Sequence, residues 1–77
     1  MGYTVKIEDN QGNEKYFYSD RAPNHVQGSA LAGRLVMHLN ATFPAYAPFS
    51  TRGNPRSGNP PANAEDIVDA DDVTEWP

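Results

Sequence analysis

The chain has 77 residues, no cysteine and a formal net charge of −4. This length allows one domain at most, and the lack of cysteine excludes disulfides and thiol chemistry. The acidic balance disfavours binding to a phosphate backbone as the main activity. No apolar run approaches a membrane span and the first residues do not read as a secretory signal, so we expect a cytoplasmic protein without a membrane role.

The negative charge is concentrated near the C-terminus. Residues 1–49 carry four acidic and four basic residues and are neutral, whereas residues 65–77 carry six acidic residues and no Lys or Arg. Such a segment predicts an anionic tail that contacts a basic protein surface. Its acidic residues are Glu65, Asp66, Asp69, Asp71, Asp72 and Glu75.

The first twenty residues have the pattern of a β-hairpin. Residues 3–8 alternate apolar and polar side chains, residues 14–19 are rich in aromatic side chains, and turn-forming residues around Gly12 separate them. Two strands of this kind need a further element to cover their apolar face.

The register of this hairpin is open between two pairings. One pairing places Ile7 opposite Tyr16, and the other places Glu8 opposite Glu14. Because directly opposed like charges are unfavourable, we expect the first pairing, which leaves Phe17 on the outer face. The residues expected on the buried face are then Val5, Ile7, Tyr16 and Tyr18.

A helix is predicted from about His25 to Phe43, ending at Pro44. Asn24 is the natural N-cap. Because Gly28 costs about 1 kcal/mol relative to Ala in a helix, Ser29 is an alternative cap with an irregular segment before it. One arc of the helical wheel is apolar and predicts the core face. It comprises Leu31, Ala32, Leu35, Val36, Leu39 and Phe43.

The apolar pattern stops after residue 49. Residues 50–64 are rich in Gly, Pro, Asn and Ser without a large apolar side chain, which predicts a flexible linker. The expected fold class is therefore α+β, with a hairpin packed on one helix over residues 1–49. A third short strand within 45–50 is left open. The linker and a disordered acidic tail over 65–77 complete the expected domain organisation.

No group of residues supports catalysis. His25 and His38 lie thirteen positions apart without metal-ligand spacing, and Ser29 does not lie in a nucleophile elbow. The clustered acids lack the glycine and the terminal glutamate of a calcium loop. We therefore predict no catalytic residue, no metal, no cofactor and no enzymatic activity.

Two features favour contact with another protein. The side of the helix opposite its core arc carries small residues and one methionine, which permits close approach and adapts to irregular surfaces, although helix propensity alone also accounts for the alanines. Trp76 lies among acids and either anchors a partner or folds back onto the core. The predicted partner-binding residues are Ala30, Gly33, Arg34, Met37, His38, Ala41 and Trp76.

These surfaces predict a small protein-binding regulator or inhibitor that docks on a larger host machine, such as RNA polymerase, while its tail contacts a basic surface. Very small chains without cysteine or motifs are common among viral and mobile-element products. A homodimer through the helix is a second arrangement of the same surface. The alternative function is a nucleic-acid-binding accessory protein, with the aromatic hairpin as the binding face and the acidic tail as an autoinhibitor. We expect direct nucleic-acid binding to be the less favoured activity.

Overall fold

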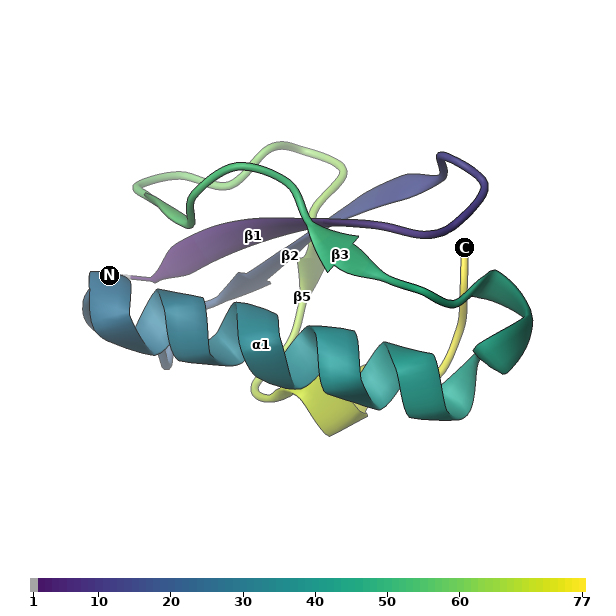
Figure 1. The fold of residues 1–77 in the computed structure, drawn as a ribbon. Helices are drawn as coiled ribbons and strands as arrows, with labels where there is room; N and C mark the ends of the chain where they lie inside the picture. The colour runs from purple at the N-terminus through teal and green to yellow at the C-terminus, as the bar shows by residue number, and fades with distance from the viewer. Residues whose placement is uncertain (1) are drawn as a thin grey trace.

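The computed structural model describes residues 2–77 and has an α+β fold, in which one α-helix packs across one face of a mixed sheet (Figure 1). The predicted class is confirmed, and a third short strand begins at Ser50, the last residue of the range 45–50. The elements are β1 (Tyr3–Glu8), β2 (Glu14–Ser19), α1 (His25–Thr42), the 3₁₀ turn η1 (Pro44–Tyr46), β3 (Ser50–Thr51), β4 (Arg56–Ser57), β5 (Glu65–Asp66) and the 3₁₀ turn η2 (Ala70–Asp72).

The long hairpin is extended on both sides by very short strands. Strand β1 pairs antiparallel with β2 on one side and with β3 and β4 on the other. Strand β5 runs parallel to β2 on its outer edge. Edge strands with unpaired backbone groups invite association with other chains, and here the segment after residue 49 covers both edges of the hairpin.

The expected register of the hairpin is wrong. Val5 lies opposite Phe17 and Glu8 lies opposite Glu14. Phe17 is therefore fully buried beneath the sheet, whereas Tyr16 and Tyr18 are half-buried on the opposite face.

The turn explains this register. Asp9 accepts hydrogen bonds from the backbone N–H groups of Gln11 and Asn13 and from the Asn13 side chain, at 2.8 to 2.9 Å, which fixes a longer turn than a two-residue loop. The opposed glutamates each have a base beside them: Glu8 pairs with Arg52, and Glu14 lies 3.2 Å from the Lys6 ammonium. The repulsion that argued against this register is therefore offset by bases outside the pair.

Helix α1 follows the predicted pattern closely. The Asn24 side chain accepts a hydrogen bond from the Gln27 N–H at 3.0 Å, so Asn24 and not Ser29 is the N-cap. The helix ends at Thr42, just before Pro44 begins η1. In the expected core arc, Leu31, Ala32, Leu35 and Leu39 are buried, and Val36 and Phe43 are half-buried against them.

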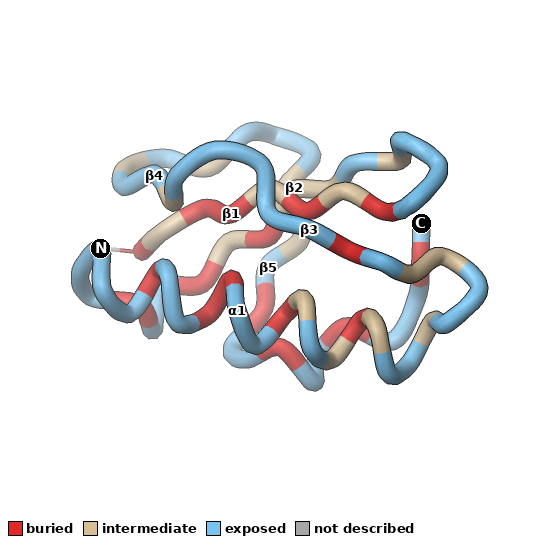
Figure 2. The backbone as a smooth tube through the Cα atoms, viewed as in Figure 1, coloured by how far each residue is buried: buried red, intermediate tan, exposed pale blue. Residues whose placement is uncertain are grey.

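The C-terminal segment differs from the expected disordered tail. Its buried residues recur every third position and join the same core as Val5, Phe17 and Leu35 (Figure 2). A three-residue period suits the 3₁₀ turn η2 and the extended chain around it. Because Ala70 is small, the larger apolar residues of the segment alone do not reveal this period. The four residues are Ile67, Ala70, Val73 and Trp76.

Residues 50–64 also differ from the expected linker, because β3 and β4 pair with β1 within this range. The hydrophobic core draws on residues from both sides of the expected boundary at residue 49, so the described chain has one core that includes the acidic segment.

Candidate functional site

The face of α1 that points away from the core forms an exposed strip. Its members follow one another at spacings of three and four, and all are exposed, with Met37 74% and Val26 72% accessible. Large apolar side chains with this exposure contribute nothing to the core. We call this surface the helix strip and define it as Val26, Ala30, Gly33, Met37 and Ala41. Val26 was not among the predicted contact residues, although its spacing of four before Ala30 places it on the same face.

Two other predicted contact residues connect α1 to the C-terminal segment. The Arg34 guanidinium donates to the Asp69 carboxylate at 2.9 Å, and the His38 imidazole donates to the Val73 carbonyl at 2.8 Å. The Ala70 backbone N–H and then Arg34 hold the pKa of Asp69 below its ordinary value. The acidic segment is therefore held beside the helix strip.

The predicted acidic residues lie on this folded segment. Asp72 accepts from the Val68 and Asp69 backbone N–H groups and completes a capping box with Asp69. Glu65 is half-buried and pairs with Lys15 at 3.0 Å. The exposed acidic residues of the segment are Asp66, Asp69, Asp71, Asp72 and Glu75. Their negative charge is thus presented by a fixed surface.

Trp76 is removed from the candidate surface. Its side chain is 8% exposed, stacks on Phe17 at 6.3 Å between ring centroids and meets Phe49 edge-on at 4.9 Å. Of the two expected outcomes, the indole folds back onto the core, so it is not available as an anchor for a partner.

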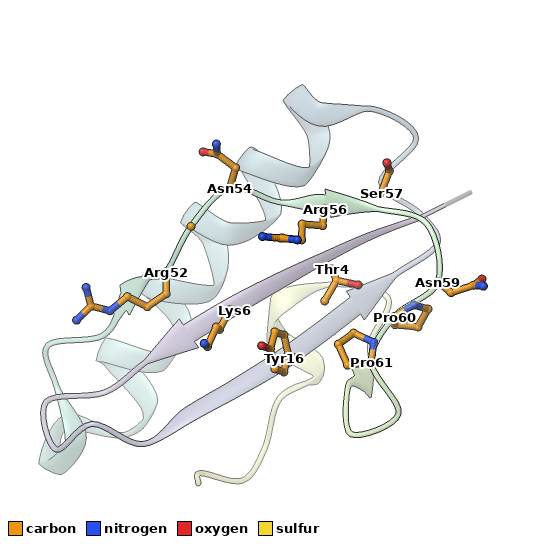
Figure 3. A pocket seen from close by; sticks show the side chains of 11 residues that line it. Thr4, Lys6, Tyr16, Arg52, Asn54, Arg56, Ser57, Asn59, Pro60 and Pro61 are labelled. Atoms are coloured by element: carbon orange, nitrogen blue, oxygen red, sulfur yellow. The ribbon is translucent and has the colours of Figure 1, made fainter.

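A second surface lies on the face of the sheet away from α1. It is an open groove of about 750 Å³ between the hairpin and the loop that contains β4 (Figure 3). Gly53 and Gly58 turn the chain on either side of β4 with φ angles of 74° and 95°. Residues with a Cβ rarely adopt such positive φ angles. The lining residues are Thr4, Lys6, Tyr16, Arg52, Gly53, Asn54, Arg56, Ser57, Asn59, Pro60 and Pro61.

The charged residues in the lining are all basic. Within residues 2–77, no Asp or Glu lines the groove. The Lys6 ammonium lies 5.4 Å from the centre of the Tyr16 ring, and the hydrogen bond and charge of Glu14 raise its pKa. Arg52 pairs with Glu8, whereas Arg56 makes no ion pair within the described part of the chain.

Sequence reasoning missed this groove for two reasons. The wrong register placed Tyr16 in the core, and the linker interpretation left Arg52 and Arg56 without a structural context. The available signal was the presence of both arginines in a segment with no acidic residue between positions 50 and 64.

No cluster of His, Asp or Glu suited to a metal ion occurs among residues 2–77. Among the same residues, no helix is both long enough and apolar enough to cross a bilayer. Comparisons of the chain with protein-family models, with curated proteins and with solved structures find no match.

Proposed function

We propose that the protein is a small non-enzymatic regulator or inhibitor that docks on a larger protein through the helix strip. The observation that carries this proposal is the exposure of Met37 and Val26 on one side of an otherwise well-packed helix. Small residues between them leave the backbone approachable, and methionine adapts to irregular apolar surfaces. Exposed apolar side chains that line up on one face are typical of contact surfaces.

The charge beside the helix strip suggests the kind of partner. The ion pair between Arg34 and Asp69 holds the acidic segment next to the helix, and Val68 adds a further exposed apolar side chain there. An apolar patch bordered by bases would complement this surface in both hydrophobicity and charge. Nucleic-acid-handling machines such as RNA polymerase carry large basic surfaces, so a transcription regulator that acts on such a host machine fits the proposal. The lack of cysteine favours action in a reducing cytoplasm.

Order in the acidic segment strengthens this proposal. A segment that becomes ordered only on binding loses part of the interaction energy to conformational entropy. Here Asp69 and Asp72 are already engaged in the capping box of η2, so that loss is avoided. Electrostatic attraction from a fixed acidic surface should chiefly raise the association rate.

The test compares Met37→Glu with Ala62→Glu in affinity capture from the native host. Both positions are exposed and both variants gain one negative charge, but Ala62 lies in the loop before β5, outside the helix strip. A partner that docks on the strip should be captured by the wild type and by Ala62→Glu and lost with Met37→Glu, because a charge without a counter-ion enters a desolvated contact.

Light scattering of the purified protein checks the dimer arrangement separately. If the wild type is a dimer and Met37→Glu is a monomer, the helix strip is a surface of self-association. Equal capture by both variants would contradict docking at this surface.

A further inference from the structure

The charges of this acidic protein are separated in space. Arg52 and Arg56 lie at the β1 edge of the sheet, where β3 and β4 pair with β1, whereas the acidic segment begins at the β2 edge, where β5 pairs with β2. The net charge of −4 is the sum over these two unlike regions. It therefore does not describe the electrostatic environment of the groove, where the charged lining residues are Lys6, Arg52 and Arg56.

The groove offers three kinds of contact to a ligand: positive charge, an aromatic surface and uncharged polar groups. Lys6, Arg52 and Arg56 supply positive charge for phosphates, and Arg in particular binds phosphate oxygens through two donors. The half-buried Tyr16 ring supplies an aromatic surface from β2, beside the Lys6 ammonium (Figure 3). The loop also contributes uncharged polar residues to the lining: Asn54, Ser57 and Asn59.

The existing ion pairs do not block such a ligand. Lys6 with Glu14, and Arg52 with Glu8, are pairs in which at least one side chain is substantially exposed. Exposed pairs of this kind contribute only about 0–1 kcal/mol, so phosphates can replace the carboxylates. Arg56 needs no exchange, because it makes no ion pair among residues 2–77.

We propose that this groove binds a short segment of single-stranded nucleic acid, with Lys6, Arg52 and Arg56 on the phosphates and Tyr16 against a base. Proteins that bind single strands without sequence preference combine a basic groove with aromatic side chains in this way. The groove is open to solvent, which lets a strand enter it. This activity belongs to a different face from the helix strip and is independent of the proposed protein docking. Since the acidic segment contributes nothing to the lining, the autoinhibition that the alternative function assigns to the tail has no support in this arrangement.

The test measures fluorescence anisotropy of a labelled twelve-nucleotide oligothymidine at low salt with the full chain. The decisive comparison is Arg56→Ala against Arg21→Ala. Both arginines are exposed and both variants lose one positive charge, but Arg21 follows β2 outside the groove. We expect Arg56→Ala to weaken binding at least about fivefold and Arg21→Ala to weaken it less than about twofold.

The salt dependence and the aromatic contact give two further readouts. Three phosphate contacts predict that log Kd rises with log salt at a slope of roughly 2, and Arg56→Ala should reduce that slope by about 0.7. Tyr16→Ala should weaken binding at least about fivefold through lost stacking, with circular dichroism confirming that the variant is folded. If that variant does not fold, Arg56→Ala alone decides.

Two further ligands complete the experiment. An oligoglutamate peptide of the same length should bind at least tenfold more weakly than the oligonucleotide, since it lacks rings for Tyr16. Equal binding of the two would overturn the proposal in favour of an acidic peptide site. Tighter binding of thymidine monophosphate than of the strand would overturn it in favour of a mononucleotide site.

Equal loss of binding with Arg56→Ala and Arg21→Ala, or no binding of the strand at low salt, would also overturn the proposal. Met37→Glu should bind the oligonucleotide as the wild type does, so the two proposals fail separately.

Discussion

The indole nitrogen of Trp76 donates a hydrogen bond to the Asp9 carboxylate at 2.8 Å, which joins the C-terminal segment to the hairpin turn across 67 positions of the sequence. Asp9 also fixes the turn through Gln11 and Asn13. One carboxylate therefore determines both the register of the hairpin and the position of the last core residue.

The first prediction concerns Trp76→Ala. Truncation of a buried Trp costs about 3–5 kcal/mol, and a domain of this size has roughly 4–12 kcal/mol of total stability. We expect the melting temperature to fall by more than about 10 °C, because the indole contacts Phe17 and Phe49 in the core. Thermal unfolding followed by circular dichroism measures this.

The exposed Val68, in the same segment, is the matched control for that variant. Val68→Ala should shift the melting temperature by no more than a few degrees. If both variants melt like the wild type, the segment after residue 64 does not contribute to the core.

The second prediction concerns pH. Burial alone would raise the pKa of Asp9, but hydrogen bonds from Trp76, from the Asn13 side chain and from the backbone of Gln11 and Asn13 outweigh it and lower the pKa to about 2. As the pH falls from about 4 to about 2, the unfolded chain takes up a proton at Asp9 before the folded protein does. The stabilisation is thus complete above about pH 4 and is lost as the pH approaches 2.

Urea unfolding at several pH values tests this linkage. Asp9→Asn should be less stable than the wild type at pH 6, and the difference between them should shrink between pH 4 and pH 2. Asp71→Asn, at an exposed position of η2, should run parallel to the wild type over that range. A constant difference between Asp9→Asn and the wild type would show that the Asp9 carboxylate has an ordinary pKa in the folded protein.

The third prediction tests the register of the hairpin. Phe17 is fully buried, whereas Tyr16, its neighbour in β2, faces the groove. Phe17→Ala should therefore destabilise the protein by about 3–5 kcal/mol, and Tyr16→Ala should cost about 2 kcal/mol less, because Tyr16 is only partly buried and keeps part of its surface in solvent. The two variants are compared by urea unfolding. The opposite order would restore the register with Tyr16 in the core.

Local pattern was enough to predict α1 and its orientation. The 3.6-residue period of Leu31, Leu35 and Leu39 identified the buried side, and Asn24 marked the start of the helix. These features depend on residues within a few turns of one another. Exposure of Met37 followed from the same period, so the helix strip was also predictable apart from its first member.

Contacts between distant parts of the chain were not predictable in this way. The pairing of Glu8 with Glu14 is tolerated because Arg52, 44 positions after Glu8, lies beside it. Strands of two residues such as β3, β4 and β5 are too short to leave a period in the sequence. The groove depends on where these strands place Arg56, so its recognition had to wait for the structure.

The last prediction concerns the two glycines of α1. A Cβ at Gly33 would have nothing within 4 Å, so Gly33→Ala should stabilise the fold by roughly 0.5–1 kcal/mol through helix propensity. A Cβ at Gly28 would lie 3.1 Å from the Pro55 Cβ and 3.2 Å from the Tyr3 ring. Because overpacking costs typically about 1–3 kcal/mol, Gly28→Ala should be no more stable than the wild type. Urea midpoints should therefore rise for Gly33→Ala and not for Gly28→Ala.

If the helix strip binds a partner by close backbone approach, Gly33→Ala should also weaken capture of that partner despite its higher stability. Gly33→Ala with higher stability and undiminished capture would instead show that the partner contacts the side chains around Met37 without approaching the backbone.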